Sequence, residues 1–150
     1  MRTAHFIQSL IHTAFLAVLF GFTSGRVSAH PQEPPSTLQQ HVRAIERAIA
    51  SRSLPTIREY LNPKKTFIDI LGKPATYLSV NQAVAVIESF LRVYLPVGYA
   101  LGLIKEGPAT SIAISTLRVK TATGERHLKL TMGFTKDSET HWLINRIVIR

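Results

Sequence analysis

The sequence predicts an α+β domain in which two or three N-terminal helices cover one face of an antiparallel sheet. Apolar residues recur at helical spacing within residues 36–51 and 79–94, and a shorter helix fits residues 54–61 between them. From residue 98 onward the period changes, and four runs rich in β-branched and aromatic residues are separated by short turns. Helices first and hairpin-linked strands afterwards are typical of α+β architecture.

Each predicted helix carries one apolar stripe and a terminal signal. Ser36 is the predicted N-cap of the first helix, and Ser79 is that of the last. Pro55 near the start and Asn62-Pro63 after the end delimit the short helix. The stripe of the first helix leaves Arg43, Glu46 and Arg47 outside it and consists of Leu38, Val42, Ile45 and Ile49. The last helix is predicted to bury Ala83, Val86, Ile87, Phe90, Leu91 and Tyr94.

The predicted strands begin before the last helix. Residues 66–71, "TFIDIL", form a first strand that Gly72 ends. Turn residues at 107–108, 122–125 and 136–139 separate the later strands, and gaps of this length between neighbours indicate antiparallel hairpins. The later strands are predicted over residues 98–107, 110–121, 126–136 and 141–150.

The N-terminus has the order of a secretory signal peptide. A basic start is followed by an apolar run over residues 14–22 and by small residues that end at Ala29. We expect cleavage after Ala29, then a proline-rich linker over residues 30–35 and a domain over 36–150. An uncleaved N-terminal anchor is the alternative, although the run is short for a bilayer core of about 30 Å. The predicted location is therefore periplasmic or extracellular, with no stable membrane span after cleavage.

Composition narrows the range of functions. The chain has no cysteine, which excludes disulfides, thiol catalysis and cysteine-ligated zinc. Its formal net charge of +9 falls to +7 once Arg2 and Arg26 leave with the leader. The basic residues are scattered, with at most two in succession, which favours a solvated surface over a binding patch. Export also makes nucleic acid an unexpected partner.

The ordered elements resemble the nuclear transport factor 2-like superfamily, and within it a bacterial family of small exported proteins of unknown function. The likeness rests on "YLN" before the first strand, "ILGK" at residues 70–73, "YLSVNQAVAVIESFL" at 77–91 and the closing "HWLINRIVIR". It implies a strongly curved sheet wrapped on the helices as a cone. The superfamily includes enzymes such as ketosteroid isomerase and scytalone dehydratase as well as non-catalytic binding modules, so the fold does not decide the activity.

Asp69 is a candidate catalytic base, because a cone-pocket isomerase needs a carboxylate or histidine beside a tyrosine donor. Tyr77 and His127 are further catalytic candidates. Strand alternation, however, groups Thr66, Ile68 and Ile70 on the core side. Asp69 is then expected on the outer face with Phe67 and Leu71, a candidate dimer surface.

Other polar and aromatic residues are candidates for lining a pocket. If Leu143, Ile147 and Ile149 face the core, alternation places Asn145 inside with them. Arg118 has the same ambiguity, and Trp142 is expected in the core or at an edge. No histidine pair has ligand spacing on one element, so we expect no metal and no cofactor. The candidate pocket residues are Tyr60, Tyr94, Tyr99 and Asn145.

The favoured hypothesis is a non-catalytic exported module that binds a small apolar ligand or a protein partner and forms a homodimer through its sheet. One alternative is a cone-pocket isomerase, dehydratase or cyclase with Asp69 or His127 as base and a tyrosine donor. The other is the binding of anionic polymers by the basic surface.

Overall fold

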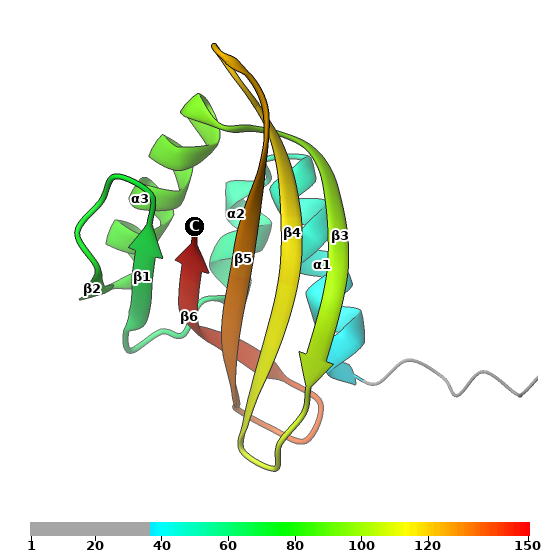
Figure 1. Ribbon diagram of the computed structural model, residues 1–150. Helices are drawn as coiled ribbons and strands as arrows, with labels where there is room; N and C mark the ends of the chain where they lie inside the picture. Colours follow the sequence, from blue (N-terminus) through cyan, green and yellow to red (C-terminus); the bar gives the residue numbers. More distant parts are fainter. Residues whose placement is uncertain (1–36) are drawn as a thin grey trace, which may run out of the picture. The chain divides into compact units, whose positions relative to one another are not determined.

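The computed structural model describes Thr37–Arg150, which lie within one compact unit. It contains three helices and six strands, and Figure 1 shows the helices together on one side of the sheet. The predicted leader, the linker and the cap at Ser36 lie outside the described residues. The elements are α1 (Thr37–Ala50), α2 (Leu54–Tyr60), β1 (Thr66–Ile70), β2 (Thr76–Leu78), α3 (Val80–Val93), β3 (Leu95–Lys105), β4 (Thr110–Thr121), β5 (Gly124–Lys136) and β6 (Trp142–Ile149).

The helices follow the predicted signals. α3 begins after Ser79, whose backbone N–H donates to Gln82 Oε1 over 3.1 Å, so the predicted cap is confirmed. Pro55 stands in the first turn of α2, where its missing N–H costs no helical hydrogen bond. None of the described helices is long and apolar enough to cross a membrane.

The six strands form one open sheet in the order β2-β1-β6-β5-β4-β3. The predicted α+β fold with its helix-covered sheet is confirmed, but the sheet is mixed because β1 pairs with β6 in parallel. That pairing joins Ile68 to Ile147, so the first and last strands of the domain lie side by side. β3 forms one edge, and Pro96 and two register shifts within it limit further pairing there.

β2 is the element that the sequence did not predict. Thr76–Leu78 turn back on β1 as an antiparallel hairpin in which Tyr77 pairs with Phe67. This three-residue strand directly precedes the cap of α3, and the sequence interpretation treated it as the approach to that helix. The hairpin matters for the surface because it places an exposed tyrosine beside the first strand.

The core lies between the helices and the inner face of the sheet. β1 alternates as predicted, with Thr66, Ile68 and Ile70 buried and Phe67 and Asp69 only partly buried. Trp142 is 3% exposed and belongs to the core, as expected. The largest fully buried side chains are Phe134, Leu38, Ile45, Ile57, Ile68, Ile70, Leu117, Leu130, Met132, Ile144, Val42 and Val119.

Candidate functional site

The interior cavity between the helices and the sheet is small and apolar. It has a volume of about 30 Å³ and exposes no polar surface. Sites for drug-sized ligands usually span roughly 300–1,000 Å³, so this cavity is too small for such a ligand. It also lacks the carboxylate or histidine that an isomerase pocket needs. Its lining consists of Ile45, Ile49, Ile57, Ile87, Phe90, Leu91, Leu117, Leu130, Met132, Ile144, Ile147 and Ile149.

Asp69 and His127 both lie on the outer face, away from this cavity. Asp69 forms an ion pair with Arg150, which follows the last strand. The His127 side chain is 65% exposed, and its Nε2 lies 3.7 Å from Glu125 Oε1. The hypothesis that either residue acts as a base inside the cone is therefore corrected, because neither side chain reaches the interior.

The interior position predicted for Asn145 is also wrong, because a β-bulge shifts the alternation of β6. Phe134 pairs with Ile144 while Gly133 pairs with Arg146, so Asn145 is an extra residue between them. Ile144 rather than Leu143 joins the core cluster. The Asn145 amide donates to Thr135 Oγ1, and a Cβ built at Gly133 would lie 2.8 Å from Asn145 Oδ1. Asn145 therefore covers the outer side of β5.

The candidate tyrosines do not converge on a pocket. Tyr60 contacts the ring of His41 edge to face, with centroids 5.5 Å apart, and His41 also contacts the His141 ring. Tyr94 stacks on Phe90 with centroids 4.8 Å apart. These contacts account for both tyrosines as packing groups.

Tyr99 does enter a polar cluster, beside a carboxylate that the sequence interpretation placed on the solvent side. The Tyr99 hydroxyl and the buried Ser115 hydroxyl are 2.5 Å apart, joining β3 to β4. The Tyr99 hydroxyl also lies close enough to the Glu46 carboxyl on α1 to favour its charged form. Oε1 of Glu46 is nevertheless buried without a hydrogen-bond partner among residues 37–150. The curved sheet brings edge strand β3 against α1, which the helical stripe did not indicate.

Burial governs the titration of this cluster. It raises the pKa of Glu46, and the positive charge of Arg43 and the Tyr99 hydroxyl partly offset that rise. Burial also raises the pKa of Tyr99; its bond with Ser115 opposes this rise and the nearby Glu46 charge adds to it. The Tyr99 hydroxyl thus links Ser115 on β4 with the Glu46 carboxyl on α1. We therefore interpret the cluster as a structural junction between α1 and the sheet.

The outer face of the sheet, opposite the helices, carries the exposed groups. Strand register fixes its layout: Leu103 pairs with Ile114, and Ile114 with Thr131. Thr131 pairs with Val148, and Phe67 pairs with both Arg146 and Tyr77. We name the apolar side chains in and beside these rows the apolar half: Phe67, Tyr77, Leu103, Ile112, Ile114 and Val148.

Three members of the apolar half are unusually exposed for their type. Tyr77 is 65%, Leu103 53% and Ile112 46% exposed. The Phe67 ring meets Tyr77 with centroids 5.2 Å apart, and the Arg146 guanidinium lies 4.8 Å from the centre of the Phe67 ring. The apolar half therefore presents an aromatic end at β1 and β2 and an aliphatic end at β3 and β4.

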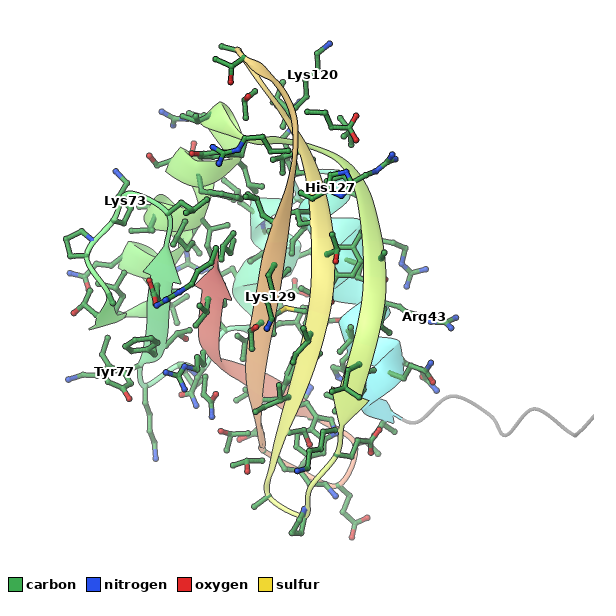
Figure 2. The ribbon with its side chains drawn as sticks, in the orientation of Figure 1. Arg43, Lys73, Tyr77, Lys120, His127 and Lys129 are labelled. Atoms are coloured by element: carbon green, nitrogen blue, oxygen red, sulfur yellow. The ribbon has the colours of Figure 1, made fainter. Side chains whose placement is uncertain are left out.

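The other half of the same face is basic. Figure 2 shows His127 and Lys129 projecting from the face of the sheet that is turned away from the helices, with Lys120 near the end of the β4–β5 hairpin. Arg118 pairs with His127, and Lys129 exchanges two backbone hydrogen bonds with Arg150. We name these side chains the basic half: Arg118, Lys120, His127, Lys129 and Arg150.

Metal binding finds no support in residues 37–150, where no three histidine, aspartate or glutamate side chains lie close enough to hold an ion. The ring contacts of His41 join it to only one other histidine. The described residues therefore offer no candidate metal centre.

The comparisons with known proteins show the fold. No protein-family model matches the chain. No curated protein matches it either. Among solved structures it is similar to a DUF4783 family protein from Bacteroides ovatus, at 19% identity and a TM-score of 0.60, over 71% of this chain and 90% of that one.

A second DUF4783 family protein, from Bacteroides uniformis, aligns at 15% identity and a TM-score of 0.62, over 71% of this chain and 93% of that one. A ketosteroid isomerase-like protein from Erwinia carotovora atroseptica aligns at 13% identity and a TM-score of 0.65, over 75% and 92%. The domain has the nuclear transport factor 2-like fold. The predicted resemblance is confirmed at the level of fold, because these structural neighbours include DUF4783 family proteins and a ketosteroid isomerase-like protein.

Proposed function

We propose that this protein is a non-catalytic module that associates with a second copy of itself through the apolar half of the outer face. The observation that carries the proposal is the combination of an apolar interior cavity of only about 30 Å³ with outer side chains as exposed as Tyr77. Exposed apolar patches of this kind mark interaction surfaces in soluble proteins. An interior cavity of this size favours a protein partner over the small apolar ligand that the sequence also allowed.

The distribution of charge favours one arrangement of two copies. Two sheets can pack face to face about a two-fold axis that lies across the strands. The apolar halves then meet, and the two basic halves extend beyond the contact at opposite ends. This arrangement separates the like charges of Arg118 and Lys129, whereas an axis along the strands would oppose the basic halves. The proposed dimer is therefore the arrangement in which the strands of the two copies run antiparallel.

Sedimentation equilibrium tests the association. The wild-type chain is expected to have twice the monomer mass at micromolar concentration, and Tyr77→Arg/Ile112→Lys is expected to be monomeric. Ala85→Arg/Thr123→Lys adds the same two charges at exposed positions off the apolar half and should remain dimeric. A wild-type monomer, or equal dissociation of the two variants, would contradict the proposal.

We further propose that the module acts outside the cytoplasm. The proposal is supported by the basic start, the short apolar run and the small residues ending at Ala29. Cleavage there would leave a chain that begins at His30, with the proline-rich segment 30–35 ahead of the domain. Such a segment is suited to separate a domain from its surroundings.

A further inference from the structure

We propose that the basic half of the outer face binds an extended polyanion through several sulfate, phosphate or carboxylate groups at once. The inference is independent of self-association, because it rests on a different set of side chains. The first and last of these basic residues, Arg118 and Arg150, are 32 positions apart in the sequence. Strand pairing brings them together on one face of the sheet, which the sequence alone does not indicate.

The register brings the cations onto adjacent strands. Arg118 on β4 pairs directly with His127 on β5. Two residues along, Lys129 donates its backbone N–H to the Arg150 carbonyl over 2.7 Å and accepts from the Arg150 N–H over 3.0 Å. Opposed residues of an antiparallel pair project to the same side. The side chains of these residues therefore occupy one continuous surface across β4, β5 and the end of β6.

Local carboxylates do not neutralise this surface. Glu125 lies 3.5 Å from Arg118 and 3.7 Å from His127, so one carboxylate is shared between them. Asp69 is engaged with Arg150. Lys129 and Lys120 form no ion pair with any described residue. The four arginines and lysines therefore exceed the two side-chain carboxylates.

The Arg118 side chain packs over Gly98, a neighbour that has no side chain of its own. Gly98 pairs with Arg118 across β3 and β4. A Cβ at Gly98 would lie 2.6 Å from Arg118 Nε and 2.7 Å from its Nη2, so the guanidinium lies against the bare backbone. The Arg118 side chain remains 50% exposed in this position. The glycine therefore orients a cation that an incoming anion can reach, which reduces the ordering that binding requires.

A shallow hollow lies beside these cations. Its volume is about 490 Å³, and its lining includes Thr116, His127 and Lys129. Thr116 pairs with Lys129 across β4 and β5, so its hydroxyl lies beside the lysine on the outer face. A hydroxyl and two nitrogen groups around one hollow are suited to an oxyanion, which accepts hydrogen bonds from each.

The spacing of the cations favours a polymer over a single small anion. Neighbouring strands are about 4.8 Å apart and alternate residues on a strand about 7 Å apart. One small anion would contact two of these exposed cations at most, and isolated exposed charge pairs contribute only about 0–1 kcal/mol. A chain of repeated anionic groups can contact Arg118, Lys129 and Arg150 together, and such multivalent contact accumulates affinity.

Fluorescence anisotropy with labelled dextran sulfate tests the inference on the full chain. Neutral dextran of the same length is the ligand control, and polyphosphate distinguishes a phosphate from a sulfate source. We expect saturable binding of at least one polyanion, no binding of neutral dextran, and weakening as salt is raised. Circular dichroism confirms that each variant is folded.

Two charge reversals locate the site. Lys129→Glu should weaken polyanion binding by about tenfold or more, because one attraction is replaced by a repulsion. Lys73→Glu makes the same change in net charge on the loop between β1 and β2, which Figure 2 shows apart from His127 and Lys129, and should change binding by less than about twofold.

Equal loss in the two variants would overturn the inference, as would the absence of saturable binding to every polyanion. Neither Lys129 nor Lys73 belongs to the apolar half, so the sedimentation mass should be the same for both variants. A monomeric wild-type chain that still binds dextran sulfate would contradict only the proposed dimer. A dimer that binds no polyanion would contradict only this inference.

Discussion

The Asp69 carboxylate on β1 and the Arg150 guanidinium beyond β6 form an ion pair on the outer face of the sheet. The Asp69 side chain is 19% exposed and that of Arg150 is 73% exposed. The pair links β1 to the end of β6, because Asp69 pairs with Val148 in the parallel contact and Arg150 follows Ile149. A carboxylate engaged in this way is a structural group on the surface of the fold.

Asp69→Asn is therefore expected to fold and to lose at most about 1 kcal/mol in its free energy of unfolding, the usual range for exposed ion pairs. Urea unfolding measures the change. Glu88→Gln, which removes the exposed pair between Glu88 and Arg92 on α3, is the matched control and should behave similarly. A loss of unfolding free energy several times larger for Asp69→Asn alone would contradict the assignment of this carboxylate to a surface ion pair.

Tyr99→Phe tests the junction between α1 and the sheet. Removing the hydroxyl leaves the buried Ser115 without its side-chain partner, and we expect the free energy of unfolding to fall by about 1–3 kcal/mol. Tyr94→Phe is the control, because the Tyr94 hydroxyl forms no hydrogen bond among the described residues and its ring stacks on Phe90. Similar losses in both variants would show that the Tyr99 hydroxyl contributes nothing specific.

Glu46 gives the stability of the domain a particular pH dependence. Burial raises its pKa in the folded state above the ordinary value of 4.5, so the folded chain holds this proton more strongly than the unfolded chain. The contribution of this group to stability is therefore fully present below 4.5 and declines as the pH rises through the folded-state pKa.

Glu46→Gln removes that decline. In urea unfolding measured from acidic to neutral pH, the variant should gain on the wild-type chain as the pH increases. Glu59→Gln on α2 removes an exposed carboxylate and should run parallel to the wild type. Parallel curves for Glu46→Gln as well would contradict the assignment of a raised pKa to this carboxyl group.

The N-terminal sequence of the exported protein tests the leader. Expressed with its own N-terminus in a bacterium, the chain is expected to accumulate outside the cytoplasm and to begin at His30. Replacing Ala29 by a bulky residue should block processing at that bond, and an unchanged cytoplasmic chain beginning at Met1 would remove the export proposal.

The sequence correctly predicted features that depend on a single helix or strand. The alternation of Thr66, Ile68 and Ile70 predicted which side of β1 is buried, because a period of two fixes side-chain direction within a strand. Ser79 likewise marked the start of α3, because a cap depends on residues three positions apart.

What the sequence could not predict depends on pairing between distant segments. The parallel contact of Ile68 with Ile147 has no local signal, and a bulge opposite Gly133 reversed the expected direction of Asn145. Glu46 was assigned to solvent because the first helix alone does not reveal that β3 curves against it. The basic half is the clearest case, since its residues are scattered along the chain and meet only through the strand register.

Cross-linking of single cysteines measures the central claim, self-association through the outer face, most directly. The chain has no cysteine, so Thr131→Cys introduces one thiol in the middle of that face, between Ile114 and Val148. Arg47→Cys places the control thiol at an exposed position on α1. With a short bis-maleimide at micromolar protein concentration, we predict a covalent dimer for Thr131→Cys and almost none for Arg47→Cys. Equal yields from the two positions, or none from Thr131→Cys, would contradict the claim.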